Sequence, residues 1–206
     1  MSIESRLEAL EAQVQQALSA IGQHAQFEPG GLAVSHNITT RTIVLSAAGG
    51  APTTTSGCAD STKVEAGTND VDYWTLDFSA STDEFAFWGP LVMPENWDGG
   101  KFRAIPHWTA ASGSGTVAWA ISMACRGNDD AIDQAWGTAV TSTDTLITAG
   151  DVHEGPETEP ITPAGTLAAG AMLFVRVMRD VSEDTLGVDA RLIAIKITYN
   201  TARYAD

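Results

Sequence analysis

The first 21 residues of the chain carry an apolar position every three or four residues. The spacings between these positions are 4, 3, 4, 3 and 4, which is the a/d pattern of a coiled coil. This pattern predicts an N-terminal helix with a narrow apolar stripe, which we expect to mediate oligomerisation. The residues of the stripe are Ile3, Leu7, Leu10, Val14, Ala17 and Ile21.

An alternative for the same segment is an amphipathic helix that lies on its own domain. The stripe is narrow and keeps its heptad period without drift, which favours a coiled coil formed by several copies of the chain. Such a helix spans only about 30 Å, and Gly22 interrupts the pattern. We therefore expect the coiled coil to extend an oligomer that another domain also maintains. Pro29, Gly30 and Gly31 end the helix and form a hinge.

From residue 71 onward, apolar residues alternate with polar or small ones, which is the period of β-strands with one buried face. Turns rich in Gly, Asn and Asp separate these segments. The pattern predicts a mainly β, antiparallel sandwich of about eight strands. The expected strands are 72–78, 85–88, 101–110, 116–125, 135–146, 172–179 and 188–199, preceded by a single strand at 42–46.

These patterns divide the chain into an N-terminal helix or coiled coil at 1–27, a hinge and extended arm at 28–70, and a β-sandwich domain at 71–206. Strand phase places Trp74, Trp108 and Trp119 in the core. The strands at 172–178 and 192–197 are apolar on both faces. Because only one face of a sandwich strand meets the core, we expect the other face to form an intersubunit contact.

Charge and cysteine content limit the classes of partner. The chain has 11 basic and 26 acidic residues, a formal net charge of −15, and no cluster of Lys and Arg. A nucleic-acid-binding surface needs such a cluster, so we expect no nucleic-acid partner. No segment approaches the roughly 20 apolar residues of a membrane span, so we expect no membrane insertion. Cys58 and Cys125 are expected as buried free thiols, and a disulfide between them stays open as the alternative.

Two acidic segments are candidates for a cation site, and solvated turns explain both of them better. Residues 151–159 contain one His and four carboxylates, but His153 lacks the second His of a helical zinc site. Asp129, Asp130 and Asp133 lack the spacing of an EF-hand. The chain has neither a G-x-S-x-G nucleophile motif nor a phosphate-binding loop. We therefore expect no metal, no cofactor and no catalytic residue.

A series of strand-and-turn segments lies between residues 70 and 200. They are NWDGGK at 96–101, HWTA at 107–110, SGSGTV at 112–117, DQAWGTA at 133–139, FVRVMRDV at 174–181, DTL at 184–186 and DARL at 189–192. Together these segments resemble virion surface proteins of tailed bacteriophages, namely head spikes, head fibres or decoration proteins with a jelly-roll domain. The architecture is also similar to that of gene-transfer-agent head spikes.

The resemblance implies a non-enzymatic structural protein on the surface of the virion. It implies a jelly-roll sandwich, a homotrimer, and an N-terminal region that attaches to the major capsid protein or another virion protein. An alternative is a tail-fibre or receptor-binding module that recognises a host cell-surface polysaccharide. For that alternative Trp97 and Trp136, which lie at turns or strand edges, are the candidate glycan contacts. A polysaccharide-degrading enzyme is disfavoured because the acidic residues concentrate in turns rather than as a pair across a groove.

Overall fold

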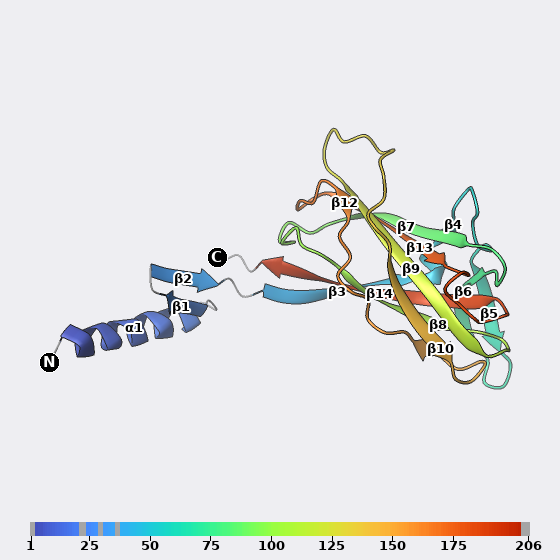
Figure 1. The fold of residues 1–206 in the computed structure, drawn as a ribbon, viewed down its shortest axis with the longest axis horizontal. Helices are drawn as coiled ribbons and strands as arrows, with labels where there is room; N and C mark the ends of the chain where they lie inside the picture. Colours follow the sequence, from blue (N-terminus) through green and yellow to red (C-terminus); the bar gives the residue numbers. More distant parts are fainter. Residues whose placement is uncertain (1–2, 21–23, 29–30, 36–37, 203–206) are drawn as a thin grey trace.

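The structure, a computed structural model, describes residues 3–20, 24–28, 31–35 and 38–202. Its long axis runs from an N-terminal helix and hairpin at one end to a β-sandwich at the other (Figure 1). α1 (Ile3–Ala20) is the helix that the heptad pattern predicts, and β1 (His24–Glu28) pairs antiparallel with β2 (Gly31–Ser35) beside it. None of the described helices has the length and the hydropathy that crossing a membrane requires.

The apolar stripe of α1 is largely open to solvent in this single chain. Leu7 and Leu10 are 55% and 57% exposed, and Val14 is half-buried. The exposed leucines are compatible with a coiled coil, and both the coiled coil and the oligomer stay predictions. For the other three predicted positions no side chain is described: Ile3 and Ala17 have only their backbone described, and Ile21 lies outside the described residues.

Two six-stranded sheets face each other and form the sandwich that the alternating pattern predicts. One sheet has the order β10-β9-β13-β7-β4, with β12 parallel to β9; the other has the order β11-β8-β14-β6-β5, with β3 paired to β14. The strands are β3 (Ile38–Ser46), β4 (Ala51–Pro52), β5 (Thr62–Ala66), β6 (Val71–Phe78), β7 (Glu84–Val92), β8 (Arg103–Thr109), β9 (Gly115–Arg126), β10 (Val140–Leu146), β11 (His153–Glu154), β12 (Ala164–Gly165), β13 (Met172–Arg179) and β14 (Ala190–Ala202).

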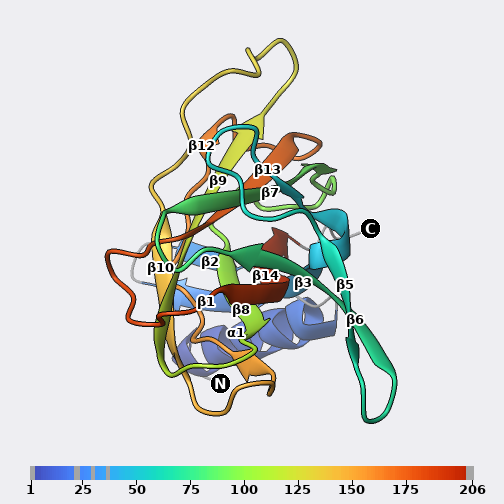
Figure 2. The ribbon, with the colours of Figure 1, turned by 90° about the vertical axis from the view of Figure 1, so that its right-hand side faces the viewer.

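The chain passes repeatedly from one sheet to the other. β6 and β7 lie in different sheets, as do β7 and β8, β8 and β9, and β13 and β14. Crossings of this kind are typical of jelly-roll sandwiches, in which the two sheets share one core. Figure 2 looks from the sandwich end toward the helix, with the loop that follows β9 at the top and the β5–β6 hairpin extending at the lower right.

Large aromatic side chains occupy the core between the sheets. Trp108 and Trp119 are fully buried, with ring centroids 6.4 Å apart, and Phe78 lies edge-on to Trp119 at 5.1 Å. The predicted core position of these two tryptophans is confirmed. The prediction for Trp74 is wrong, since it is 44% exposed. Its strand, β6, pairs with β14 only near Phe78 and continues into a hairpin with β5, beyond the facing sheet.

Two other departures from the sequence pattern have local causes. The alternation in the last strand breaks because the register between β14 and β8 shifts between Leu192 and Ala194, which is a β-bulge at Ile193. The strand expected at 135–146 begins only at Val140. The residues before it belong to a loop held by the buried Arg126, whose guanidinium donates to the carbonyls of Ile132 and Gln134.

The strand expected at residues 42–46 is present as β3 and is longer than expected. It pairs along β14 from Ser46 opposite Ala194 to Ile38 opposite Ala202. β8 borders β14 on its other side, with Arg103 opposite Thr198. This arrangement brings three segments that are far apart in sequence to one end of the sheet, where a groove forms.

Candidate functional site

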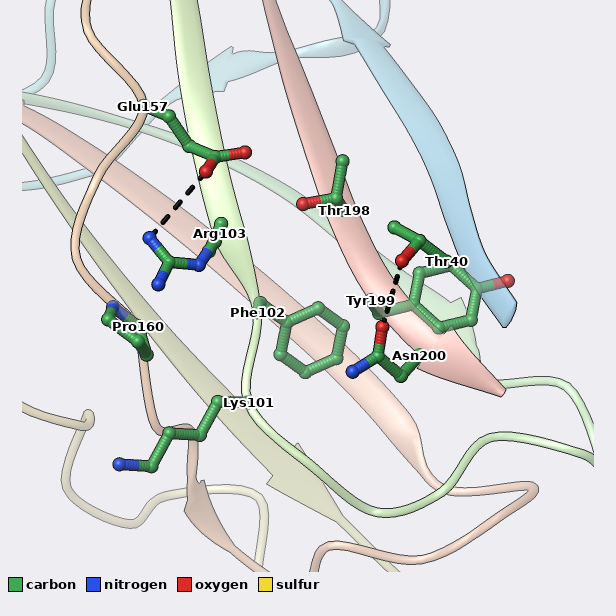
Figure 3. A pocket seen from close by; sticks show the side chains of 9 residues that line it. All are labelled: Thr40, Lys101, Phe102, Arg103, Glu157, Pro160, Thr198, Tyr199 and Asn200. Atoms are coloured by element: carbon green, nitrogen blue, oxygen red, sulfur yellow. Dashed lines mark hydrogen bonds and ion pairs between the residues drawn. The ribbon is translucent and has the colours of Figure 1, made fainter. Parts of the chain in front are cut away.

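A groove of about 410 Å³ lies where β3, β8 and β14 meet the segment that follows β11 (Figure 3). It is lined by residues near the end of the sandwich from which β3 and β14 extend toward the helix; Figure 1 shows the course of these two strands. Its lining residues are mostly polar or charged: Thr40, Lys101, Phe102, Arg103, Glu157, Pro160, Thr198, Tyr199 and Asn200.

Strand alternation explains which side chains enter the groove. On β8, Ala104 is fully buried on the core side, so Arg103 points to the outer face. On β14, Ile197 is buried and Thr198, directly opposite Arg103, shares the outer face. Polar residues on this face therefore gather into one patch because the register of β8 and β14 aligns them.

Hydrogen bonds hold the charged wall of the groove. Arg103 Nη1 donates to the carbonyl of Thr158 at 2.9 Å and lies 3.5 Å from Glu157 Oε2. Thr158 is buried, and its Oγ1 accepts from the backbone N–H of Ala104 at 3.0 Å. The segment that carries Glu157 is thereby fixed against β8. The Arg103 and Glu157 side chains themselves remain about two-fifths exposed, at 42% and 43%.

The opposite wall is made by the β3–β14 ladder. Thr40 Oγ1 donates to Asn200 Oδ1 at 3.2 Å, across a ladder that places these two residues opposite each other. This bond fixes the orientation of the Asn200 amide, since its oxygen is used as an acceptor and its NH₂ group is left to donate. Figure 3 shows the pair on one side of the Phe102 ring and the Arg103–Glu157 pair on the other.

Three aromatic rings in tilted contact lie beneath and beside the groove. Phe102 is fully buried, and its ring centroid lies 5.3 Å from that of Trp97 and 6.1 Å from that of Tyr199. Trp97 was expected as a glycan contact at a turn. Its backbone does lie in a turn, but its side chain is only 4% exposed. Trp97 therefore supports Phe102 from below and offers no ring face to a ligand.

Trp136, the other candidate glycan contact, does not line the groove; it lies in the β9–β10 loop and packs on the outer face of the other sheet. Its ring is 4.7 Å from the Arg176 guanidinium carbon, and the Phe85 ring is 5.0 Å from the same carbon. Burial lowers the pKa of Arg176. Trp136 is half-buried, so part of its ring remains open. This cluster also covers part of the outer face of β13, which the sequence pattern assigned to an intersubunit contact.

The acidic segments considered for a cation are built as turns. Asp130 Oδ2 accepts from the Gly127 backbone N–H at 2.8 Å; a side-chain hydrogen bond with Thr166, followed by this backbone bond, lowers the pKa of Asp130. His153 is buried, stacks on Trp108 at 5.0 Å, and its Nε2 lies 3.1 Å from the Thr148 carbonyl oxygen. Within the described ranges, no three His, Cys, Asp or Glu side chains converge to hold a metal ion.

Sequence reasoning missed the residues that form the groove. Lys101 and Arg103 are two positions apart, which puts them on one face of a strand, and two cations this close together are unusual in a chain this acidic. This spacing could have indicated the site from the sequence alone. The sequence could not have indicated Thr40 and Asn200, because these residues are 160 positions apart and meet only through the pairing of their strands.

No protein-family model matches this sequence, and no curated protein matches it. Several solved structures are similar to it. The xylan-binding family 22 module of Xyn10C from Paenibacillus barcinonensis is 16% identical, covers 78% of this chain and 99% of its own, and has a TM-score of 0.45. The C-terminal family 6 carbohydrate-binding module of the laminarinase LamC from Zobellia galactanivorans is 11% identical, covers 77% and 99%, and has a TM-score of 0.38.

A family 11 carbohydrate-binding module from Clostridium thermocellum is 10% identical, covers 85% of this chain and 94% of its own, and has a TM-score of 0.38. Identities and TM-scores this low carry no argument about what the chain binds. The two-sheet sandwich is defined by the strand pairings of this chain, and the groove is defined by the side chains that line it.

Proposed function

We propose that this chain is a non-enzymatic protein that binds a glycan in the groove between β3, β8 and β14. The observation that carries the proposal is the composition of the groove: charged and polar side chains form both walls, beside the partly exposed ring of Tyr199 and above the buried ring of Phe102. Sugars present many hydroxyl groups that both donate and accept hydrogen bonds, so their sites need side chains of both kinds. Glu157 accepts, Lys101 and the Asn200 amide donate, and the Thr198 hydroxyl does both.

The size of the groove agrees with this class of ligand. Small-molecule sites generally enclose about 300–1,000 Å³, and this groove lies near the lower end at about 410 Å³. A volume of this size has room for a sugar unit. The side chains that would contact it are held by the strand register and by the Thr40–Asn200 bond, which limits the entropy lost on binding.

The proposal is tested by glycan-array screening of the full chain, followed by calorimetry with each oligosaccharide that binds. Asn200→Ala removes the donor amide and should weaken binding about three- to tenfold, the effect of one or two hydrogen bonds. Thr143→Ala, an exposed polar change on β10 in the other sheet, is the matched control and should leave affinity unchanged. Equal affinity of the Asn200→Ala variant and the wild type for every binding glycan would place the site elsewhere and overturn the proposal.

A second proposal concerns where such a protein acts. The sequence resemblance implies a homotrimeric spike or decoration protein of a phage particle, and the separate position of α1 and its exposed leucines favours a role of the N-terminal region in attachment or assembly. We propose that this region binds the capsid protein or another virion protein and that the sandwich points outward. The test is binding of the full chain to particles stripped of it. Replacing Leu7 and Leu10 by Glu should abolish particle binding, and unchanged binding would contradict the attachment role.

A further inference from the structure

The basic residues of this acidic chain differ in their contacts. Five of those on the sandwich contact carbonyls, carboxylates or aromatic rings. These residues are Lys63, Arg126, Arg176, Arg179 and Arg191. Lys101 and Arg103 instead line the groove, and both side chains extend toward the segment that carries Glu157 and Pro160 (Figure 3). Arg41 on β3 is also exposed, but it does not line the groove; Lys101 and Arg103 are the two cations that do.

A third cation lies on the same face. Lys196 on β14 is opposite Ile105, and Thr198 is opposite Arg103, so Lys196 and Arg103 are diagonal neighbours across the two strands. Diagonal neighbours on one face of an antiparallel pair lie about 7–8 Å apart, within reach of long side chains. Lys196 is half-buried among its neighbours and is directed outward, since Ile195 and Ile197 on either side are fully buried in the core.

The side chains that line the groove carry more positive than negative charge. Glu157 is the one carboxylate among the lining residues, at 3.5 Å from Arg103. Asp98, three positions before Lys101, and the exposed Glu159, next to Pro160, also carry negative charge, but neither side chain lines the groove. Two cations and one carboxylate leave the groove with a surplus positive charge, and Lys196 adds to it. The chain as a whole carries −15, so the local sign is opposite to the overall sign.

Several donors at this site are unused within the part of the chain that the structure describes. Arg103 commits only Nη1, to the Thr158 carbonyl and Glu157, so its Nε and Nη2 groups are left to donate. The Lys101 ammonium has no hydrogen bond or ion pair among the described residues. An ammonium and a guanidinium with unused N–H groups form charge-assisted hydrogen bonds with an anionic group, and these are stronger than neutral ones.

We propose that the groove selects acidic sugars, with the anionic group of the sugar bound between Lys101 and Arg103. This inference rests on the proposed glycan-binding function and names the class of sugar. The ring hydroxyls then meet Glu157, Thr198 and Asn200 on the two walls. The anionic group is a carboxylate, as in a uronic acid, or a sulfate ester, and both offer oxygen acceptors to the same two cations. Arg103 already has Glu157 at 3.5 Å, whereas a neutral sugar would leave the Lys101 ammonium without an anionic partner in the groove.

The test uses calorimetry on the full chain with matched pairs of probes. Oligogalacturonate is compared with its methyl ester, which has the same sugar ring without the charge, and a sulfated galactan oligosaccharide is compared with its desulfated form. We expect the charged member of at least one pair to bind at least about fivefold more tightly than the neutral one, as a charge-assisted hydrogen bond predicts. The pair that shows the difference identifies the anionic group. Raising the salt concentration should reduce the difference.

The variants separate charge recognition from folding. Lys101→Ala removes an exposed side chain without internal contacts and should abolish the preference for the charged probe while leaving weak binding of the neutral one. Lys63→Ala, which removes a cation from the distant β5–β6 hairpin, is the control and should change nothing. Arg103 also holds the Thr158 carbonyl, so Arg103→Lys is used in place of alanine, with thermal melting as the check on folding.

The outcomes distinguish this inference from the function on which it rests. Equal affinity for both members of both pairs overturns the acidic-sugar inference and leaves glycan binding in place. No binding of any probe in the groove overturns both. If Lys101→Ala changes the oligomeric mass of the protein in solution but not its affinity for sugar, the cations belong to a contact between copies of the chain. The inference is then overturned as well.

Discussion

Arg179 and Asp184 form an ion pair inside the sandwich, with Arg179 Nε 2.6 Å from Asp184 Oδ2 and side-chain exposures of 0% and 4%. Every N–H of the guanidinium has an acceptor, because a second donor reaches Asp184 Oδ1 and the other three reach the carbonyls of Phe78, Val188 and Leu186. A buried charge is tolerated only when its hydrogen-bonding capacity is met in this way. The pair joins the end of β13 and the loop after it to β6, which fixes the path of the chain between the two sheets.

Asp184→Asn should therefore lower the free energy of unfolding by about 3–5 kcal/mol, since it leaves the Arg179 charge buried without its counterion. Urea denaturation followed by tryptophan fluorescence measures the change. Asp151→Asn, an exposed aspartate in another loop, is the matched control and should alter stability by less than about 0.5 kcal/mol. Similar denaturation midpoints for the two variants would contradict the structural role of the pair.

The sequence pattern predicted the sandwich because alternation reports which face of each strand is buried. Alternation does not show where a strand extends beyond the packed region. The prediction that Trp74 lies in the core is wrong for that reason. The sequence correctly predicted that the Trp97 backbone lies in a turn. It did not predict the direction of the Trp97 ring, which packs inward on Phe102. Side-chain direction in an irregular segment depends on tertiary packing, and periodicity carries no information about packing.

The groove was hidden from sequence analysis for a different reason. Its two walls come from Thr40 and Asn200, near opposite ends of the chain, and from Arg103 in the middle. Strands joined by a short turn can be paired from sequence, because the turn sets their register. β3 and β14 are joined by no turn, and their pairing follows from how the whole sandwich closes. The Lys101 and Arg103 spacing indicated a charged face, but not what lay beside it.

The two tryptophans first considered as glycan contacts should behave differently when truncated. Trp97→Ala removes a buried ring from beneath Phe102 and should cost about 3–5 kcal/mol of stability. Trp136→Ala removes a half-exposed ring from one side of Arg176 and should cost about 1 kcal/mol. Chemical denaturation of both variants measures the difference. A larger loss for Trp136 would mean that the aromatic cluster on the outer face of β13, and not the Trp97–Phe102 contact, stabilises the sandwich.

The exposed stripe of α1 predicts association of the chain in solution. Sedimentation of the wild type at micromolar concentration should give three copies, the state that the sequence resemblance implies. Replacing Leu7 and Leu10 by Glu puts charge at the a and d positions and should weaken association at least about tenfold. Ala9 and Ala12, which lie outside those positions, replaced by Glu form the control with the same added charge. A monomeric wild type, or equal loss of association in both double variants, would refute a coiled-coil contact.

The two cysteines should be present as slow-reacting thiols. Both are free and buried, and burial raises the pKa of Cys58 to about 12 and that of Cys125 to about 11. Since the thiolate is the reactive form, labelling of the native chain at pH 8 should be slow. Unfolding without reductant should release two reactive thiols. A count of none would show that the thiols had formed a disulfide.

The same raised pKa values make stability depend on pH in a defined window. The thiols have a pKa of 9.0 when unperturbed and titrate higher in the folded chain, at about 12 and 11. Below pH 9 both states keep the thiols protonated, and the contribution to stability is fully present. As pH rises from 9 toward 11, the unfolded chain loses protons that the folded chain keeps, so the free energy of unfolding falls. Other groups also titrate there, so the denaturation midpoint is compared between the wild type and a variant with Cys58 and Cys125 replaced by Ala. The wild type should lose stability more steeply between pH 8.5 and 10.5, and parallel curves would contradict the effect of burial on these thiols.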